Sequence, residues 1–312
     1  MVFVLALGAA LANALTSVFQ RMGVESAPDS TTLRLSLLRY ALHRGVWLLG
    51  LGLMIVSFIC QAFALHFGQL SQVQPLLTTE LVFLVGVLAL WFGFTMGRRE
   101  WLGSIAVAGG LSGFLYFAHP TYGALSPTWW AWAVTGGACS GAMAIAVVLA
   151  MRGPRWWRAA MFGTAAAISF AFTAACTKVV SDFAASDWLL LYRHWQTYAL
   201  ALFGMLGVFL TQNAMHAGPI VASQSTLVLV DPLASILIGI GLFGDNLQTS
   251  GAAGPLEALS LLLTFAGAFS LAHSPLVSGM KGDDDRYHEL LSQRARHVPL
   301  PEALRPHPMP PS

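Results

Sequence analysis

Residues 46–67 read VWLLGLGLMIVSFICQAFALHF, a run of 22 mostly apolar residues without an Asp, Glu, Lys or Arg. A helix that crosses a hydrocarbon core of about 30 Å needs roughly 20 such residues. The whole chain has the same character: 56% of its 312 residues are hydrophobic, only 10% are charged, and the mean hydropathy is +0.67. Because a water-soluble domain cannot cover its surface with so little charge, we expect an integral membrane protein.

Apolar runs of similar length lie on both sides of this one, separated by polar residues, Gly or Pro. Together they predict an all-α membrane protein with nine transmembrane helices, over residues 2–20, 46–67, 70–94, 101–118, 128–151, 157–180, 188–215, 219–243 and 254–271. Residues 31–44 carry three Arg among Leu residues, which predicts a helix in the cytoplasmic interface. For the tail, residues 276–312, we expect a short helix and then a Pro-rich disordered end.

The basic residues indicate how such a chain is oriented. Of the 16 Lys and Arg residues, only Lys178 and Arg193 fall on one side of a nine-span protein, and the other 14 fall on the side that holds the tail. The positive-inside rule makes the richer side cytoplasmic, so we expect an outside N-terminus and a cytoplasmic C-terminus in the cell (plasma or inner) membrane. All ten Trp residues lie near predicted span ends, as an interfacial aromatic belt requires.

The two halves of the chain resemble each other. Residues 61–75 read QAFALHFGQLSQVQP and residues 212–224 read QNAMHAGPIVASQ, and each has a span boundary at its Gly. The second span therefore matches the seventh, an odd offset that makes the matching helices run in opposite directions. We expect two inverted repeats of four spans, residues 1–127 and 152–275, linked by the span at 128–151, with a site near the membrane midplane.

Three charged residues before residue 276 lie neither in connections nor in the first or last turn of a predicted span: Glu80, Lys178 and Asp231. Glu80 follows Gly68 by twelve residues and Asp231 follows Gly218 by thirteen, which puts both roughly 18 Å from their span starts, near the midplane. A charge at that depth costs about 2.5–3.5 kcal/mol, so it normally faces the protein interior.

Two interpretations of the acids remain open. In the first, both carboxylates line one central cavity, where they bind a cationic group or exchange protons. In the second, each carboxylate is hydrogen-bonded locally and serves helix packing. Burial favours the protonated acid and a bound cation favours the ionised one, so binding and proton release are coupled in the first case. For Lys178 the alternatives are a side chain that extends to the interface and an ion pair with a cavity acid.

Polar stripes extend this candidate site. Asn13, Thr16, Ser17 and Gln20 share one face of the first span, and Ser169, Thr173, Cys176 and Thr177 share one face of the sixth. Lipid offers such groups no partner, so both faces should point inward, either to line a cavity or to hydrogen-bond between helices. The candidate residues for substrate binding are Glu80, Asp231, Asn13, Ser17, Gln20, Thr173, Thr177, Gln224 and Lys178.

These patterns resemble the drug/metabolite transporter superfamily over residues 1–275. The shared features are inverted halves, a His-x-Gly turn between paired spans, and a Pro in the following helix, here Gln74-Pro75 and Asp231-Pro232. Phe243-Gly244-Asp245 is similar to the Gly-Glu ending common in that superfamily, with Asp in place of Glu. EamA-like members have an additional span in each half; nine spans with an outside N-terminus look more like the NIPA-like branch, described as magnesium transporters.

The resemblance implies a transporter of a small solute by alternating access, with proton exchange as an option, or a magnesium transporter in which Asp231 and Glu80 bind the metal. A membrane component that binds lipid or a partner without transport remains a third hypothesis. We expect no enzyme and no cofactor, because no His-Glu-x-x-His, Gly-x-Ser-x-Gly or phosphate-binding glycine loop occurs. A net charge of +2 without a basic cluster indicates no nucleic-acid partner. The pairs Gly109/Gly113 and Gly137/Gly141 predict close helix packing, within the chain or in a homodimer.

Overall fold

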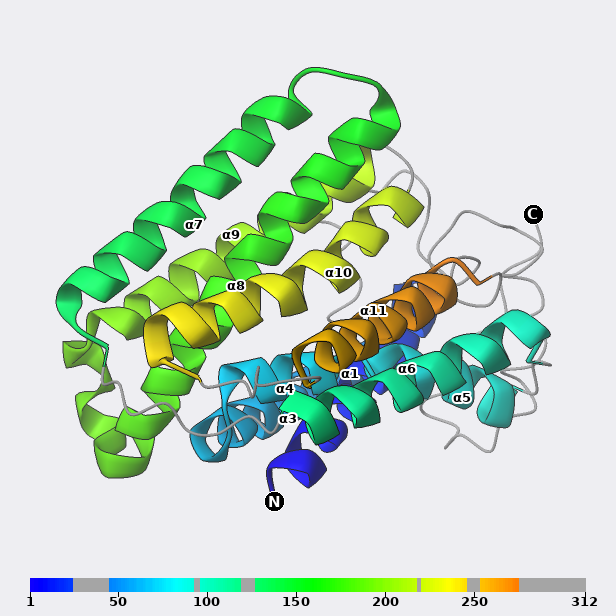
Figure 1. Ribbon diagram of the computed structural model, residues 1–312, viewed down its shortest axis with the longest axis horizontal. Helices are drawn as coiled ribbons and strands as arrows, with labels where there is room; N and C mark the ends of the chain where they lie inside the picture. Colours follow the sequence, from blue (N-terminus) through cyan, green and yellow to red (C-terminus); the bar gives the residue numbers. More distant parts are fainter. Residues whose placement is uncertain (25–44, 93–95, 119–126, 218–219, 246–252, 275–312) are drawn as a thin grey trace.

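The computed structural model describes residues 1–24, 45–92, 96–118, 127–217, 220–245 and 253–274, and these contain helices and no strand (Figure 1). The helices are α1 (Val2–Val24), α3 (Gly45–Phe67), α4 (Leu70–Leu77), α5 (Glu80–Phe92), α6 (Arg98–Ala118), α7 (Trp129–Ala150), α8 (Arg155–Asp187), the 3₁₀ helix η2 (Trp188–Arg193), α9 (Trp195–Ala217), α10 (Ile220–Ile238), the π-helical segment η3 (Gly239–Phe243) and α11 (Ala253–Ala272). The interfacial helix expected at 31–44 and the tail at 276–312 lie outside the described residues.

Seven of the described helical segments are long and apolar enough to cross a membrane. They lie in α1, α3, α4 with α5, α7, α8, α10 with η3, and α11. The expected class, an all-helical membrane protein, is therefore confirmed. Within the residues described, the apolar run of α9 is Trp195–Thr211, and α6 is not among the seven, so the count of nine is not confirmed.

The distribution of side chains fits a lipid environment. Large apolar side chains face outward, including Leu90 at 90% exposure and Leu237 at 70%. The interior of α8 is instead built from small residues, since residues 165–167 are three fully buried alanines. In lipid, helices associate through close packing of small residues, because burying large apolar side chains gains little there.

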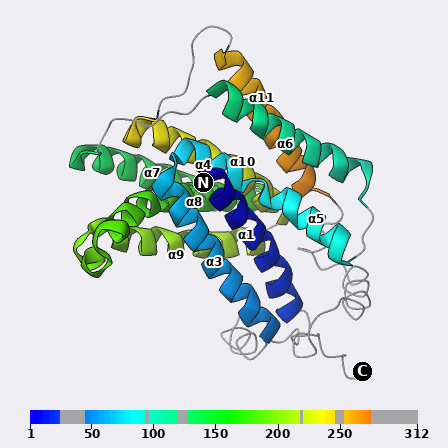
Figure 2. The same ribbon diagram turned by 90° about the horizontal axis from the view of Figure 1, so that it is seen from below.

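The helices pack in three groups that meet at the centre (Figure 2). α1 packs along α3 and against α5; α8 packs along α9 and α10 and also contacts α7; α6 pairs with α11. Contacts between α4 and α10 and between α3 and α8 join the first two groups. The centre of the molecule is therefore formed by α1, α4, α5, α8 and α10, which come from both halves of the chain.

Glycines bring α6 and α11 together. A Cβ on Gly110 would lie 2.5 Å from the backbone nitrogen of Thr264, and a Cβ on Gly113 would lie 2.6 Å from the Ser260 hydroxyl. Gly109 meets no atom within 4 Å, so the packing face contains Gly110 and Gly113 rather than the expected Gly109 and Gly113. The other expected pair, Gly137 and Gly141 in α7, also meets nothing within 4 Å.

The span that contains Pro75 is broken between α4 and α5. The hydroxyl groups of Thr78 and Thr79 donate to the backbone carbonyls of Pro75 and Leu76, each at 2.7 Å. The amide groups of Thr78 and Thr79 bond to the same two carbonyls, three residues back, so the four-residue helical spacing is interrupted. Glu80 follows directly as the first residue of α5.

Candidate functional site

Glu80 is held by a side chain of the neighbouring helix α1. The side-chain amide of Asn13 donates a hydrogen bond to Glu80 Oε2, and both residues are partly buried. The position of Glu80 at the start of α5 adds a second favourable interaction, since a helix N-terminus carries a partial positive charge that attracts an anion. The break in the span thus creates an anion-stabilising position inside an apolar helix.

Asp231 lies on α10, in the second half of the chain. The hydroxyl of Ser235, one turn further on, lies 3.4 Å from Asp231 Oδ1 and donates to it. The two acids are close enough for the charge of Glu80 to act on Asp231. The structure therefore brings together the two acids that the sequence singled out, from helices of different halves. Both acids are partly rather than fully buried.

The helix around Asp231 differs from the helix around Glu80. α10 continues through Pro232 to Ile238 without a break, and its irregularity comes later, in the π-helical segment η3. Gly244 ends η3 in a left-handed conformation, with φ 67°, which Gly adopts without strain. The segment α4 with α5 and the segment α10 with η3 are thus both irregular, but at different places relative to their acids.

Within the residues that the structure describes, the hydroxyl groups of the α8 stripe bond to backbone carbonyls rather than to the two acids. Ser169 donates to the backbone carbonyl of Phe203 in α9 at 2.7 Å, whereas Thr173 and Thr177 donate to carbonyls of their own helix, at 2.8 and 2.9 Å. The Thr173 methyl also faces Gly204 of α9, 3.7 Å from the position a Cβ would take. Of these three residues, Ser169 makes a bond between helices, as one of the two interpretations expects, and Thr173 and Thr177 bond within α8.

Of the remaining predicted residues, the structure describes the side chain of Ser17 but not those of Gln20 and Gln224. Ser17 is partly buried in α1, one turn after Asn13, and has no recorded side-chain hydrogen bond among the residues described. Gln20 lies in α1 and Gln224 lies in α10, but their side chains lie outside the described part of the structure.

Lys178 binds the end of a helix of the first half. Its ammonium donates to the backbone carbonyls of Leu65, at 3.1 Å, and of Gly68, at the C-terminal end of α3. It also lies 5.7 Å from the centroid of the Phe243 ring. Lysine is well suited to this place, because the carbonyls at a helix C-terminus lack partners and carry partial negative charge.

Asp245 is a residue of this region that sequence reasoning did not single out. It is 4% exposed, and its Oδ2 accepts hydrogen bonds from the amide and the hydroxyl of Ser71, at 3.1 and 2.8 Å. Ser71 lies in the first turn of α4, whose N-cap residue Gln69 makes no side-chain cap. Asp245 therefore caps α4 from the other half of the chain, and the signal available was the Gly-Asp that ends its span.

A second pair missed by the sequence lies beside this cap. His66 Nδ1 is 2.5 Å from Asp182 Oδ1, joining the end of α3 to α8. Lys178 is within electrostatic reach of both Asp182 and Asp245. The turn between α3 and α4 is thus attached to the second half by three charged side chains, which we call the turn cluster: Lys178, Asp182 and Asp245.

A site for a tightly bound metal is not formed by the described residues alone, because they contain no group of three or more His, Cys, Asp or Glu side chains placed to hold an ion. What Glu80, Asp231 and Asn13 offer is two carboxylates and an amide. Such a set suits a cation that is bound weakly, or one that keeps most of its water.

No protein-family model matches the chain, and no solved structure matches it. An uncharacterized protein of Corynebacterium glutamicum is 25% identical to the chain over 283 residues, which cover 87% of this chain and 96% of that protein. The similarity therefore extends over nearly the full length of both proteins and is not confined to one pair of helices.

Proposed function

We propose that the protein is a secondary transporter, of the drug/metabolite type, that moves a small solute through the membrane by alternating access. The observation that carries the proposal is that Glu80 of α5, bonded to Asn13, and Asp231 of α10 lie within electrostatic reach of each other. Two like charges held together away from water are costly unless a cation or a proton lies with them. The pair is therefore suited to bind a cationic group and to release or take up a proton as it does so.

The packing supports an inverted repeat within this proposal. α1 packs along α3 in the first half as α8 packs along α9 in the second, and the broken pair α4 and α5 corresponds to α10 with η3. α4 contacts α10, so the irregular spans of the two halves meet each other. In transporters with inverted repeats, substrate sites lie between such discontinuous spans.

The proposal keeps nine spans, an outside N-terminus and a cytoplasmic C-terminus in the cell (plasma or inner) membrane, and assigns no enzymatic role. Under this orientation the turn cluster lies on the outer side. Alternating access then requires its contacts between halves to break when the outer side opens, while Glu80 and Asp231 remain at the pivot.

A second candidate function is transport of a divalent cation such as magnesium. The observation in its favour is that two carboxylates and the Asn13 amide lie together, because magnesium takes one or two carboxylates and keeps several waters. The described residues bring no third acid or His to the pair, so we rank organic cations first.

The test is flux through purified protein in liposomes. We expect proton movement driven by small amines, reduced about tenfold or more in Glu80→Gln and in Asp231→Asn, since a hydrogen bond to a charged group contributes about 1.5–3 kcal/mol. Glu257→Gln is the control, because it also removes a carboxylate but lies in α11 and belongs to neither the acid pair nor the turn cluster. Magnesium flux that Asp231→Asn abolishes would establish the second candidate, and no flux of any kind would leave a membrane component that does not transport.

A further inference from the structure

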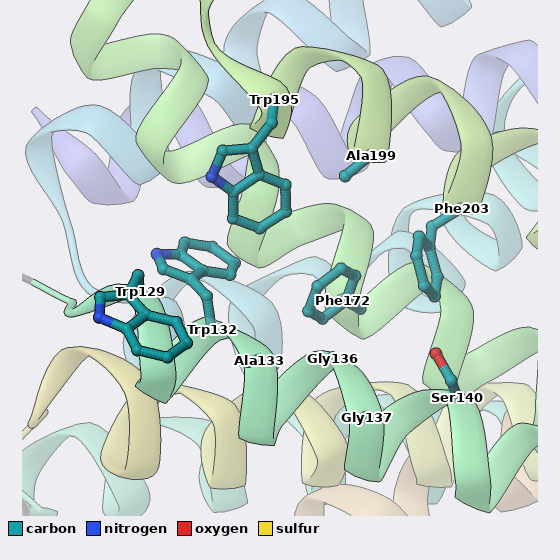
Figure 3. A pocket seen from close by; sticks show the side chains of 10 residues that line it. All are labelled: Trp129, Trp132, Ala133, Gly136, Gly137, Ser140, Phe172, Trp195, Ala199 and Phe203. Atoms are coloured by element: carbon teal, nitrogen blue, oxygen red, sulfur yellow. The ribbon is translucent and has the colours of Figure 1, made fainter.

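A cavity of about 380 Å³ lies away from the two acids, between α7 and α9 and over α8 (Figure 3). Its volume is within the range of about 300–1,000 Å³ typical of small-molecule sites. α7 contributes Trp129, Trp132 and Gly137, α8 contributes Phe172, and α9 contributes Trp195 and Phe203. None of its ten lining residues is charged, so the cavity is unsuited to an inorganic ion.

Small residues of α7 keep the cavity open to the side. Gly137 lines it, is exposed, and would place a Cβ in open space with no atom within 4 Å. Ala133, one turn earlier on the same wall, is exposed as well. Because α7 is one of the helices able to cross a membrane, the side opening faces the hydrocarbon of the bilayer. A ligand enters such an opening from the lipid and must be at least partly apolar.

The two ends of the cavity differ in chemistry. The indole nitrogens of Trp129, Trp132 and Trp195 all lie toward one end in Figure 3, and the rings of Phe172 and Phe203 lie toward the other. Trp129 and Trp195 are the first residues of α7 and α9, so this end is where the two helices begin. Trp residues at span ends sit at the level of the lipid headgroups.

Trp132 supplies the second, independent observation. It is only 5% exposed, with its ring packed edge to face against Trp195 at 5.2 Å, and its indole N–H has no recorded hydrogen bond to the residues the structure describes. A buried Trp N–H usually has an acceptor, because an unpaired donor away from water costs about 1–3 kcal/mol. The Trp132 nitrogen is not one of the fully enclosed unpaired atoms, so its N–H can be reached by a ligand. The cavity therefore offers an N–H donor at one end and an apolar aromatic wall at the other.

We propose that this cavity is a binding site for one membrane phospholipid, with an ester or phosphate oxygen at the indole N–H groups and an acyl chain along Gly137, against the rings of Phe172 and Phe203, which pack on each other with their centroids 4.5 Å apart. The ligand has the two chemistries that the cavity presents, an acceptor at the interface and a hydrocarbon chain, and it is present wherever the protein is inserted. The site is independent of the transport proposal, since it contains neither Glu80 nor Asp231.

The test measures phospholipid bound to purified protein. The protein is stripped of lipid in mild detergent, titrated with dioleoyl phosphatidylglycerol, and analysed by native mass spectrometry. We expect one lipid per chain, weaker binding by about fivefold in Trp132→Phe because one hydrogen bond is lost, and loss of the bound lipid in Gly137→Leu, whose side chain fills the cavity.

Gly141→Leu is the matched control, because Gly141 lies one turn further along α7, is also exposed with open space at its Cβ, and does not line the cavity. Binding should be unchanged in it. Equal binding by Gly137→Leu and Gly141→Leu would overturn the proposal, and so would displacement of the lipid by soluble tetramethylammonium, which would show that the aromatic faces bind a cation instead. Circular dichroism of each variant establishes that it is folded, and Trp132→Phe, which keeps the ring packing, tests the proposal separately from Gly137→Leu.

Discussion

Asn13 and Glu80 form a side-chain hydrogen bond between a polar stripe and a predicted acid, and this bond can be tested without knowing the substrate. We expect Asn13→Ala to lower the free energy of unfolding in detergent by about 1.5–3 kcal/mol, since the hydrogen bond reaches a carboxylate. The loss should be much smaller when Glu80→Gln is already present, because the charge that strengthens the bond is gone.

Ser17→Ala is the control for that measurement, because Ser17 lies one turn away on α1 and carries no recorded side-chain bond within the described residues. Unfolding followed by tryptophan fluorescence gives all four corners of the double-mutant cycle. Strictly additive effects of Asn13→Ala and Glu80→Gln would contradict the contact, and with it the coupling of α1 to the acid pair.

Gly110 tests the packing of α6 on α11 at a single position. A side chain there would meet the Thr264 backbone at 2.5 Å, so the helices must separate, and we expect Gly110→Leu to cost about 1–3 kcal/mol or more in unfolding free energy. Gly109→Leu is the matched control, because it introduces the same side chain at the neighbouring position, where a Cβ would meet no atom within 4 Å. Thermal unfolding in detergent measures both variants. Equal stability of Gly109→Leu and Gly110→Leu would mean that the α6 face toward α11 is assigned wrongly.

The break between α4 and α5 shows which part of an element the sequence can predict. Pro75 predicts an irregular helix, because it lacks an N–H and crowds the preceding turn. The break itself occurs at Thr78 and Thr79, whose hydroxyls bond to the carbonyls of Pro75 and Leu76. Such local side-chain bonds compete with helical ones in some surroundings and not in others, so the sequence predicts the irregularity but not its position.

Across the whole molecule, the membrane class and the choice of the two acids followed from bulk properties: few charges, long apolar runs, and depth counted from the repeated Gly. The rotation of each helix about its own axis could not be predicted in this way, because it depends on packing between helices that are distant in sequence. The α8 stripe therefore bonds to α9 and to itself, and Lys178 binds the end of α3. The cap of α4 by Asp245 was missed for the same reason, since its partner Ser71 is 174 residues away.

The inverted repeat requires α6 to cross the membrane, although α6 is not among the seven helices that meet the length and apolarity of a span. Its two ends must then lie on opposite sides. We expect Arg99→Cys to react with a membrane-impermeant maleimide only after permeabilisation, and Pro127→Cys to react in intact cells, in a background where Cys60, Cys139 and Cys176 are replaced by Ala. Arg99 lies in the first turn of α6 and is exposed, and Pro127 lies just before α7.

The controls are the background without the new Cys and the same labelling after membranes are opened. If both positions react from the same side, α6 does not cross, the two halves no longer have equal numbers of spans, and Glu80 and Asp231 lose the symmetric relation on which alternating access depends.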